Sequence, residues 1–114
     1  MPRRPKVHSE VPGAAEYEGA LRDFFTRPDC LYVLDVLLLL RSVKYAVAEK
    51  LYAESRLYRS AVDYLRGRRL VAVHPGDRAS VLYLTQLGRE AADSLAKLLE
   101  LIAGGEGHVA DQPG

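Results

Sequence analysis

The sequence lacks the features expected of secreted and membrane-spanning proteins. Cys30 is the only cysteine, so no intramolecular disulfide can form, and a reducing, intracellular setting is expected. The longest apolar run, Leu31 to Leu40, is too short to span a bilayer and contains Asp35. The N-terminus has no apolar signal core. We therefore expect a cytoplasmic protein with no membrane partner.

Catalytic and metal-binding patterns are also missing from the sequence. The three histidines are scattered, and no Cys/His spacing suits zinc. There is no glycine-rich loop to hold a phosphate, and no pairing of a nucleophile with a base is visible. These absences favour a binding protein over an enzyme, and they predict neither a cofactor nor a metal ion.

Charge is nearly balanced over the 114 residues, and the net charge of +1 says nothing about partners. The distribution is uneven, however. The segment from Arg41 to Arg78 contains nine basic and four acidic residues, a net charge of +5, whereas the rest of the chain has seven basic and eleven acidic residues. A basic middle segment in a neutral protein is the pattern expected of a nucleic-acid-binding surface.

The chain length predicts one domain, over residues 14–103, between a flexible basic arm (1–13) and a disordered tail (104–114). We expect helices at Ala14 to Thr26, at Cys30 to Arg41 and at Val43 to about Tyr52. Asp29 and Ser42 are the expected N-caps of the second and third helices. The second helix is apolar almost all round, so it must be buried in the core or in a subunit contact.

The stretch from Ala53 to Arg69 predicts one amphipathic helix. Leu57, Ala61, Val62 and Leu65 form an apolar stripe at helical spacing. The other face mixes arginines with short polar side chains, which suits contacts to phosphates and base edges, although a solvated surface helix shows the same pattern. Together with the short helix before it, this stretch predicts a helix-turn-helix.

A two-stranded ribbon is predicted next, from Leu70 to His74 and from Ser80 to Thr85. Pro75 and Gly76 occupy the positions that a type II turn requires between the two strands. A ribbon directly after a helix-turn-helix is the wing of a winged helix.

The last predicted element is a long amphipathic helix from Gln86 to Ala103. Thr85 can cap it with its hydroxyl group, and Gly104 is expected to end it. Gly88, in the first turn, has no side chain and lets the helix approach another backbone closely.

These pieces resemble, in their order and spacing, the winged-helix transcription regulators of the MarR type. PadR-like and compact archaeal winged-helix proteins are close alternatives within the same fold. The matching stretches are Val47 to Leu51, Ala61 to Leu65 with Leu70 and Val71, Asp77 with Arg78, and Leu84 to Arg89, whose LTQLG resembles the LTxxG that closes the wing in that family.

The resemblance implies a mainly α fold with a small two- or three-stranded β wing and a long C-terminal dimerisation helix. The DNA-binding core would cover residues 30–85, and the dimerisation helix would cover 86–103. Arg69 stands where the family usually has glycine before the wing, and Gly67 is the candidate replacement. Cys30 is interpreted as a small core residue, with a redox sensor as the alternative. A small-molecule effector has no support in the sequence.

The main functional hypothesis is a sequence-specific transcription regulator that binds double-stranded DNA. Its expected DNA contacts are Arg56, Arg59 and Ser60 in the major groove, Ser55, Lys44 and Tyr58 at phosphates or base edges, and Arg78 at the wing tip. Tyr58 is alternatively a partial core residue. Arg66, Arg68 and Arg69 either contribute to binding or only neutralise the C-terminal end of the helix. The alternative function is a winged-helix adaptor for proteins without specific DNA binding.

The apolar surface exceeds what one winged-helix body can cover, which predicts a two-fold homodimer through the first and last helices. The residues expected in the dimer interface are Leu21, Phe24, Ala91, Leu95, Leu98 and Ile102. The alternative is that these apolar stripes pack on each other within one chain.

Overall fold

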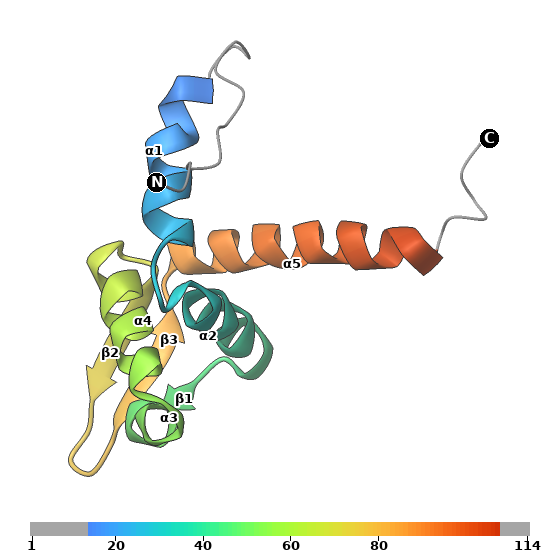
Figure 1. Ribbon diagram of the computed structural model, residues 1–114. Helices are drawn as coiled ribbons and strands as arrows, with labels where there is room; N and C mark the ends of the chain where they lie inside the picture. Colours follow the sequence, from blue (N-terminus) through green and yellow to red (C-terminus); the bar gives the residue numbers. More distant parts are fainter. Residues whose placement is uncertain (1–13, 108–114) are drawn as a thin grey trace.

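The computed structural model describes the backbone of residues 14–107 and the side chains of residues 17–104. The predicted basic arm and the last seven residues of the predicted tail lie outside the described residues. The described elements, in order, are α1 (Ala14–Phe25), α2 (Cys30–Val43), β1 (Ala46–Val47), α3 (Ala48–Glu54), α4 (Arg56–Gly67), β2 (Val71–Pro75), β3 (Ser80–Leu84) and α5 (Gln86–Gly107) (Figure 1). The predicted fold class, mainly α with a small sheet and a long C-terminal helix, is confirmed, and the topology is winged-helix-like.

Helix α2 is the centre of the core. It packs against both α4 and α5, and four of its apolar side chains, Val33, Val36, Leu37 and Leu40, are buried. Burying each of these side chains stabilises the fold by roughly 1.5–3 kcal/mol. The apolar helix is therefore covered mainly within its own chain, and Leu31 is its most exposed large apolar side chain, at 74%.

The sheet is antiparallel, with the order β1-β3-β2. Along the wing, the register runs from Val71 opposite Leu84 to Pro75 opposite Ser80. Leu82 and Leu84 on the central strand β3 are buried, whereas Tyr83 between them is exposed on the other face. The two buried leucines on one face of this strand attach the wing to the helical core.

The link between α2 and α3 differs from the prediction. Ser42 lies inside α2 and caps nothing; the chain turns at Lys44, which has a φ of 71°. Ala46 and Val47 then pair with β3, and the third helix starts only at Ala48. The predicted start at Val43 was wrong because the strand partner of these residues lies more than thirty positions away in the sequence.

The wing turn also differs from the prediction. Strand β2 continues through Pro75, which pairs with Ser80, so residues 76–79 form the loop and the predicted type II turn was wrong. Proline can continue this strand because β2 lies at the edge of the sheet, where a missing N–H group breaks no ladder.

The turn that follows α4 has its left-handed residue at Arg69 rather than at a glycine. The Arg69 backbone N–H donates to the Arg66 carbonyl (3.0 Å), and that of Leu70 donates to the Leu65 carbonyl (2.9 Å). These are the two bonds of a Schellman motif, which needs a left-handed residue, and Arg69 supplies it with a φ of 63°. Gly67 lies within the helix, so it does not replace the family's glycine as expected.

The corner before α5 confirms the local predictions. The Thr85 hydroxyl accepts from the Gly88 N–H (2.9 Å) and donates to the Arg69 carbonyl (2.7 Å). A Cβ on Gly88 would lie 1.8 Å from the Leu70 carbonyl oxygen, so only glycine fits this close approach. The predicted end at Gly104 was wrong, because α5 continues to Gly107.

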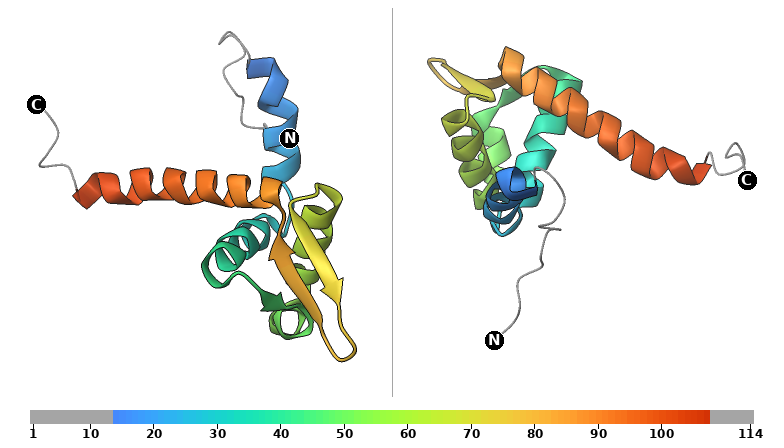
Figure 2. Two further views of the ribbon diagram at one scale, coloured as in Figure 1. Left: turned by 180° about the vertical axis from the view of Figure 1, so that it is seen from behind. Right: turned by 90° about the horizontal axis from the view of Figure 1, so that it is seen from above.

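Two helices extend away from this body. Helix α1 makes no extended contact with another described element, although Phe24 near its end packs against the core. The second half of α5 projects in a different direction, as both views of Figure 2 show. In residues 14–107, no helix combines the length and apolarity that a membrane crossing needs.

Candidate nucleic-acid interface

Helix α4 is seated by its apolar stripe. Ala61, Val62 and Leu65 are each 0% exposed. Ser55 is the N-cap of the helix, and its hydroxyl oxygen accepts from the Leu57 N–H (3.1 Å), which satisfies one of the free donors of the first turn. Because this side is buried, the opposite side, with Arg56 among its residues, must face solvent.

The arginines on this face are available to an anionic partner. Arg56, Arg59 and Arg66 are exposed, and none of them forms an ion pair among the described residues. The Arg59 guanidinium lies over the ring of Tyr52 on α3, 5.4 Å from its centroid, a contact that leaves its N–H groups free to donate. Asp63 is also exposed on α4, so the face is mixed rather than uniformly basic.

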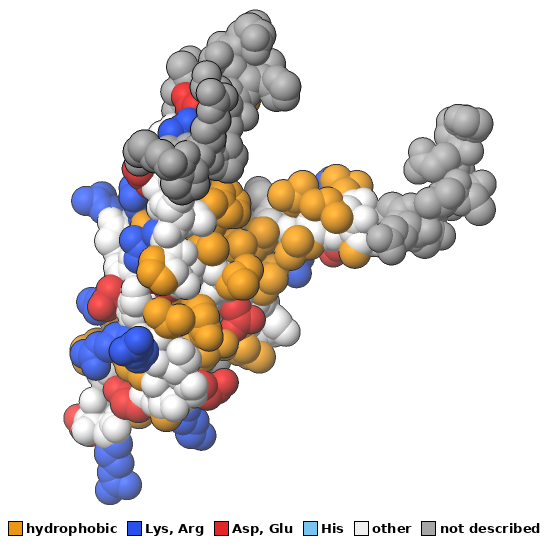
Figure 3. Space-filling model, in the orientation of Figure 1, with side chains coloured by type: hydrophobic (Ala, Val, Ile, Leu, Met, Phe, Trp, Pro, Cys, Tyr) orange, Lys and Arg blue, Asp and Glu red, His pale blue; other side chains and the backbone are white. Residues whose placement is uncertain are grey.

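The wing carries a further basic side chain. Arg78 lies in the exposed loop of residues 76–79, without an ion pair in the described part of the chain. The Glu49 carboxylate on α3 accepts from the Ser80 N–H (2.9 Å), and this bond holds the pKa of Glu49 below its ordinary value. The base of the wing is thereby attached to the helix-turn-helix. Figure 3 shows basic side chains along the α4 side and at the lower tip of the molecule.

Tyr58 has its polar group engaged within the chain. Its hydroxyl donates to Asp35 Oδ2 on α2 (2.6 Å), and its ring meets Tyr32 edge-on at 4.8 Å. The hydrogen bond to this carboxylate, together with burial, raises the pKa of Tyr58 to about 12. The half-buried ring belongs to the packing between α2 and α4, as the alternative interpretation had it.

Ser60 is engaged as well. Its hydroxyl donates to Asp29 Oδ2, and the same carboxylate accepts from Arg27 through Nε (2.8 Å) and Nη2 (2.9 Å). The predicted capping role of Asp29 was wrong, because its side chain makes no capping hydrogen bond even though α2 begins directly after it. The spacing of Arg27 and Asp29 is visible in the sequence, but no local signal identifies Ser60 as their partner.

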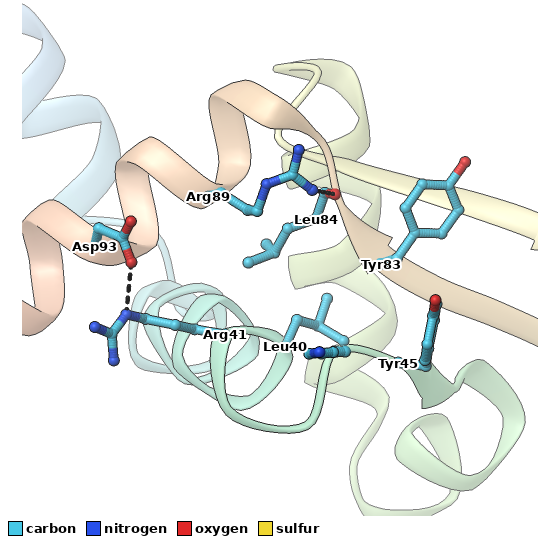
Figure 4. Close-up of a pocket in the computed structure, with 8 residues that line it drawn as sticks. Leu40, Arg41, Tyr45, Tyr83, Leu84, Arg89 and Asp93 are labelled. Carbon is cyan, nitrogen blue, oxygen red and sulfur yellow. Dashed lines mark hydrogen bonds and ion pairs between the residues drawn. The ribbon is translucent and has the colours of Figure 1, made fainter.

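Lys44 is the C-cap residue of α2. It lines a cavity of about 360 Å³ whose other walls include Tyr83 and Leu84 of the sheet and Arg89 of α5 (Figure 4). No residue of α3 or α4 lines this cavity. The sequence-predicted contacts therefore fall into three groups. Three arginines, Arg56, Arg59 and Arg78, have no ion pair among the described residues. Three hydroxyl groups, of Ser55, Tyr58 and Ser60, are engaged within the chain, and Lys44 lines the cavity.

The predicted dimer residues fall into two groups. Phe24, Ala91 and Leu95 are half-buried, and Phe24 and Leu95 pack against the core of their own chain. Leu21, Leu98 and Ile102 are exposed, the last two at 53% and 63%. Leu101 of α5 is exposed to a similar degree. The apolar stripe of α5 is thus half-buried at Ala91 and Leu95 and exposed from Leu98 onward.

Comparison of the chain with protein-family models, with curated proteins and with solved structures found no match. The functional interpretation consequently depends on the topology and on the side chains described above.

Proposed function

We propose that this chain is a sequence-specific, double-stranded-DNA-binding transcription regulator of the MarR-like winged-helix kind, acting as a homodimer. The observation that carries the proposal is the unpaired state, among the described residues, of Arg56 and Arg59 on α4 and of Arg78 on the wing. A rigid helix with outward arginines fits the width of a major groove, and arginine is the side chain that most often reads guanine there.

The helix-turn-helix and the wing both support DNA as the partner. The Glu49–Ser80 hydrogen bond attaches the wing to α3 two residues after Arg78. In winged-helix proteins that place the second helix of the helix-turn-helix in the major groove, a wing at this position reaches the adjacent backbone or minor groove. Arg78 would then contribute mainly to affinity and salt dependence, and Arg56 and Arg59 mainly to sequence preference.

The homodimer is proposed from the apolar surface that one chain leaves uncovered. Leu21 of α1 and Leu98, Leu101 and Ile102 of α5 are exposed on helices that project from the body. A two-fold axis through these helices would set two α4 helices about 34 Å apart, one turn of DNA. Light scattering tests this: a dimer is expected, and Leu101→Asp with Ile102→Asp should give a monomer, whereas Lys97→Ala should not. An unaltered chain that stays monomeric at high concentration excludes the dimer.

The DNA proposal is tested by selecting bound duplexes from a random pool at fixed salt and measuring affinity for the selected site. Arg59→Ala should cost about 1–3 kcal/mol and relax one base position, and Arg78→Ala should lower the salt slope by about one unit. Arg89→Ala with Lys97→Ala, which lie outside the interface on α5, is the matched control and should change neither. Unchanged affinity and slope after replacing Arg56, Arg59 and Arg78 together would exclude the proposal. An adaptor protein would show little charge-driven binding even to random duplex at low salt.

A further inference from the structure

Asp29 is the one charged residue that is buried among the described side chains, at 1% exposure. Its carboxylate accepts three hydrogen bonds: Arg27 Nε donates to Oδ1, Arg27 Nη2 donates to Oδ2, and the Ser60 hydroxyl donates to Oδ2. A buried carboxylate is costly unless its oxygens are paired, so this group constrains its donors strongly. The proposed DNA contacts give the Asp29 carboxylate no role.

The network joins two parts of the fold. Arg27 and Asp29 lie in the turn between α1 and α2, and Ser60 lies on α4. The Arg27 guanidinium also lies over the ring of Tyr64, with 4.1 Å to the centroid. Ser60 and Tyr64 are four residues apart and therefore occupy successive turns on one side of α4. The segment between α1 and α2 thus contacts two successive helical turns of α4.

Such a contact adds to what the apolar stripe does. Hydrophobic burial of Ala61, Val62 and Leu65 decides which side of α4 faces the core, but the hydrophobic effect is not directional and does not fix the exact rotation of the helix. A hydrogen bond between a serine and a fixed carboxylate is directional in both distance and angle. Ser60 is four residues from Arg56, so anything that sets the position of Ser60 about the helix axis also sets that of Arg56.

We propose that Arg27, Asp29 and Ser60 form a clamp that sets the rotation of α4 about its own axis and so orients Arg56 and Arg59 toward DNA. This inference rests on the proposed DNA-binding function. Ser60 is then a positioning residue and reads no base. Because Arg27 lies two residues beyond the end of α1, the clamp also links the orientation of α1 to that of α4.

The affinity experiment uses Ser60→Ala and Asp29→Asn in the full chain, measured on the selected DNA site over a range of salt, at a temperature where every variant is folded. Each variant should bind the selected site about tenfold more weakly and random duplex with little change, because the lost hydrogen bond to a buried charge no longer holds Arg56 and Arg59 toward the bases. The salt slope should not change, because no phosphate contact is removed. Ser60→Thr, which keeps the hydroxyl, should recover most of the affinity, and Ser94→Ala, an exposed serine on α5, is the matched control.

Two results would overturn the clamp. If Ser60→Ala relaxes the preference at a single base position, Ser60 reads that base. If Ser60→Ala binds like Ser94→Ala, the hydrogen bond to Asp29 positions nothing.

A measurement without DNA separates this inference from the proposed function. In Ser60→Ala and Asp29→Asn, the amide hydrogens of α4 should exchange faster than in the unaltered chain, and this increase should be larger for α4 than for α2. In Ser94→Ala, exchange in α4 should not change. If the unaltered chain binds no DNA but this exchange pattern appears, the proposed function fails while the clamp on α4 remains. If α4 exchange is unchanged, the clamp is refuted whatever the chain binds.

Discussion

Arg69→Gly should stabilise this protein, although it removes a whole side chain. Arg69 has a φ of 63°, where the Cβ of an L-residue crowds the following carbonyl oxygen. It stays there because the Schellman bonds of Arg69 and Leu70 satisfy the last carbonyls of α4. Glycine adopts the same backbone without steric cost.

The expected magnitude follows from two opposing terms. Relief of the left-handed conformation is worth about 1–2 kcal/mol. Glycine's greater freedom in the unfolded chain offsets about 0.4–1 kcal/mol of that gain. A net stabilisation of about 0.5–1 kcal/mol remains, which corresponds to a rise in Tm of about 3–6 °C for a domain of this size.

The assay is thermal and denaturant unfolding followed by circular dichroism, with two control variants. Arg69→Ala keeps the Cβ and should give no gain. Arg68→Gly changes the neighbouring residue, whose φ of −91° is unstrained, and should stabilise nothing. If Arg69→Ala stabilises as much as Arg69→Gly, the gain comes from removing a positive charge among neighbouring arginines, and the backbone argument is refuted.

Three further predictions concern other parts of the structure. Gly88→Ala should destabilise the fold by about 3 kcal/mol or more in denaturant unfolding, because its Cβ would meet the Leu70 carbonyl, and a variant as stable as the unaltered chain would contradict the close approach. Arg27 holds the pKa of Asp29 below its ordinary value of 3.8, so the stability that Asp29 contributes is fully present above about pH 4 and declines as the pH falls below it; Asp29→Asn should flatten this dependence of the unfolding free energy on pH. Tyr58, with its pKa raised to about 12 by the bond to Asp35, should be among the last of the seven tyrosines to ionise, and Tyr58→Phe should remove this late step from the tyrosinate absorbance titration.

The elements that the sequence predicts well are those whose causes are local. Helix α4 was predicted because its apolar stripe repeats within twelve residues. The predicted bounds, Ala53 to Arg69, were too wide, because Ala53 and Glu54 belong to α3 and α4 spans Arg56–Gly67. The corner at Thr85 and Gly88 was predicted with its physical roles, because a hydroxyl cap and a missing Cβ act within one helical turn. The wing was predicted as two strands, with an error confined to its turn.

The features that the sequence did not predict depend on partners that are distant in the sequence. Strand β1 is only two residues long and exists because β3 offers it a free edge. The Ser60 hydroxyl, expected in the DNA groove, meets a carboxylate 31 positions earlier in the chain. Lys44, expected at phosphates or base edges, lines a cavity together with Arg89 and Asp93 of α5.

The sequence alone determined which segments are helical, which faces are apolar, and where basic residues concentrate, since each depends on neighbours within a few positions. The tertiary structure decided which polar groups remain available. It pairs Asp29 with Arg27 and Ser60 and Tyr58 with Asp35, and it leaves Arg56, Arg59 and Arg78 without ion pairs among the described residues. Hydrogen bonds are directional and short-ranged, so whether a side chain is engaged depends on the packing of helices that the chain order does not reveal.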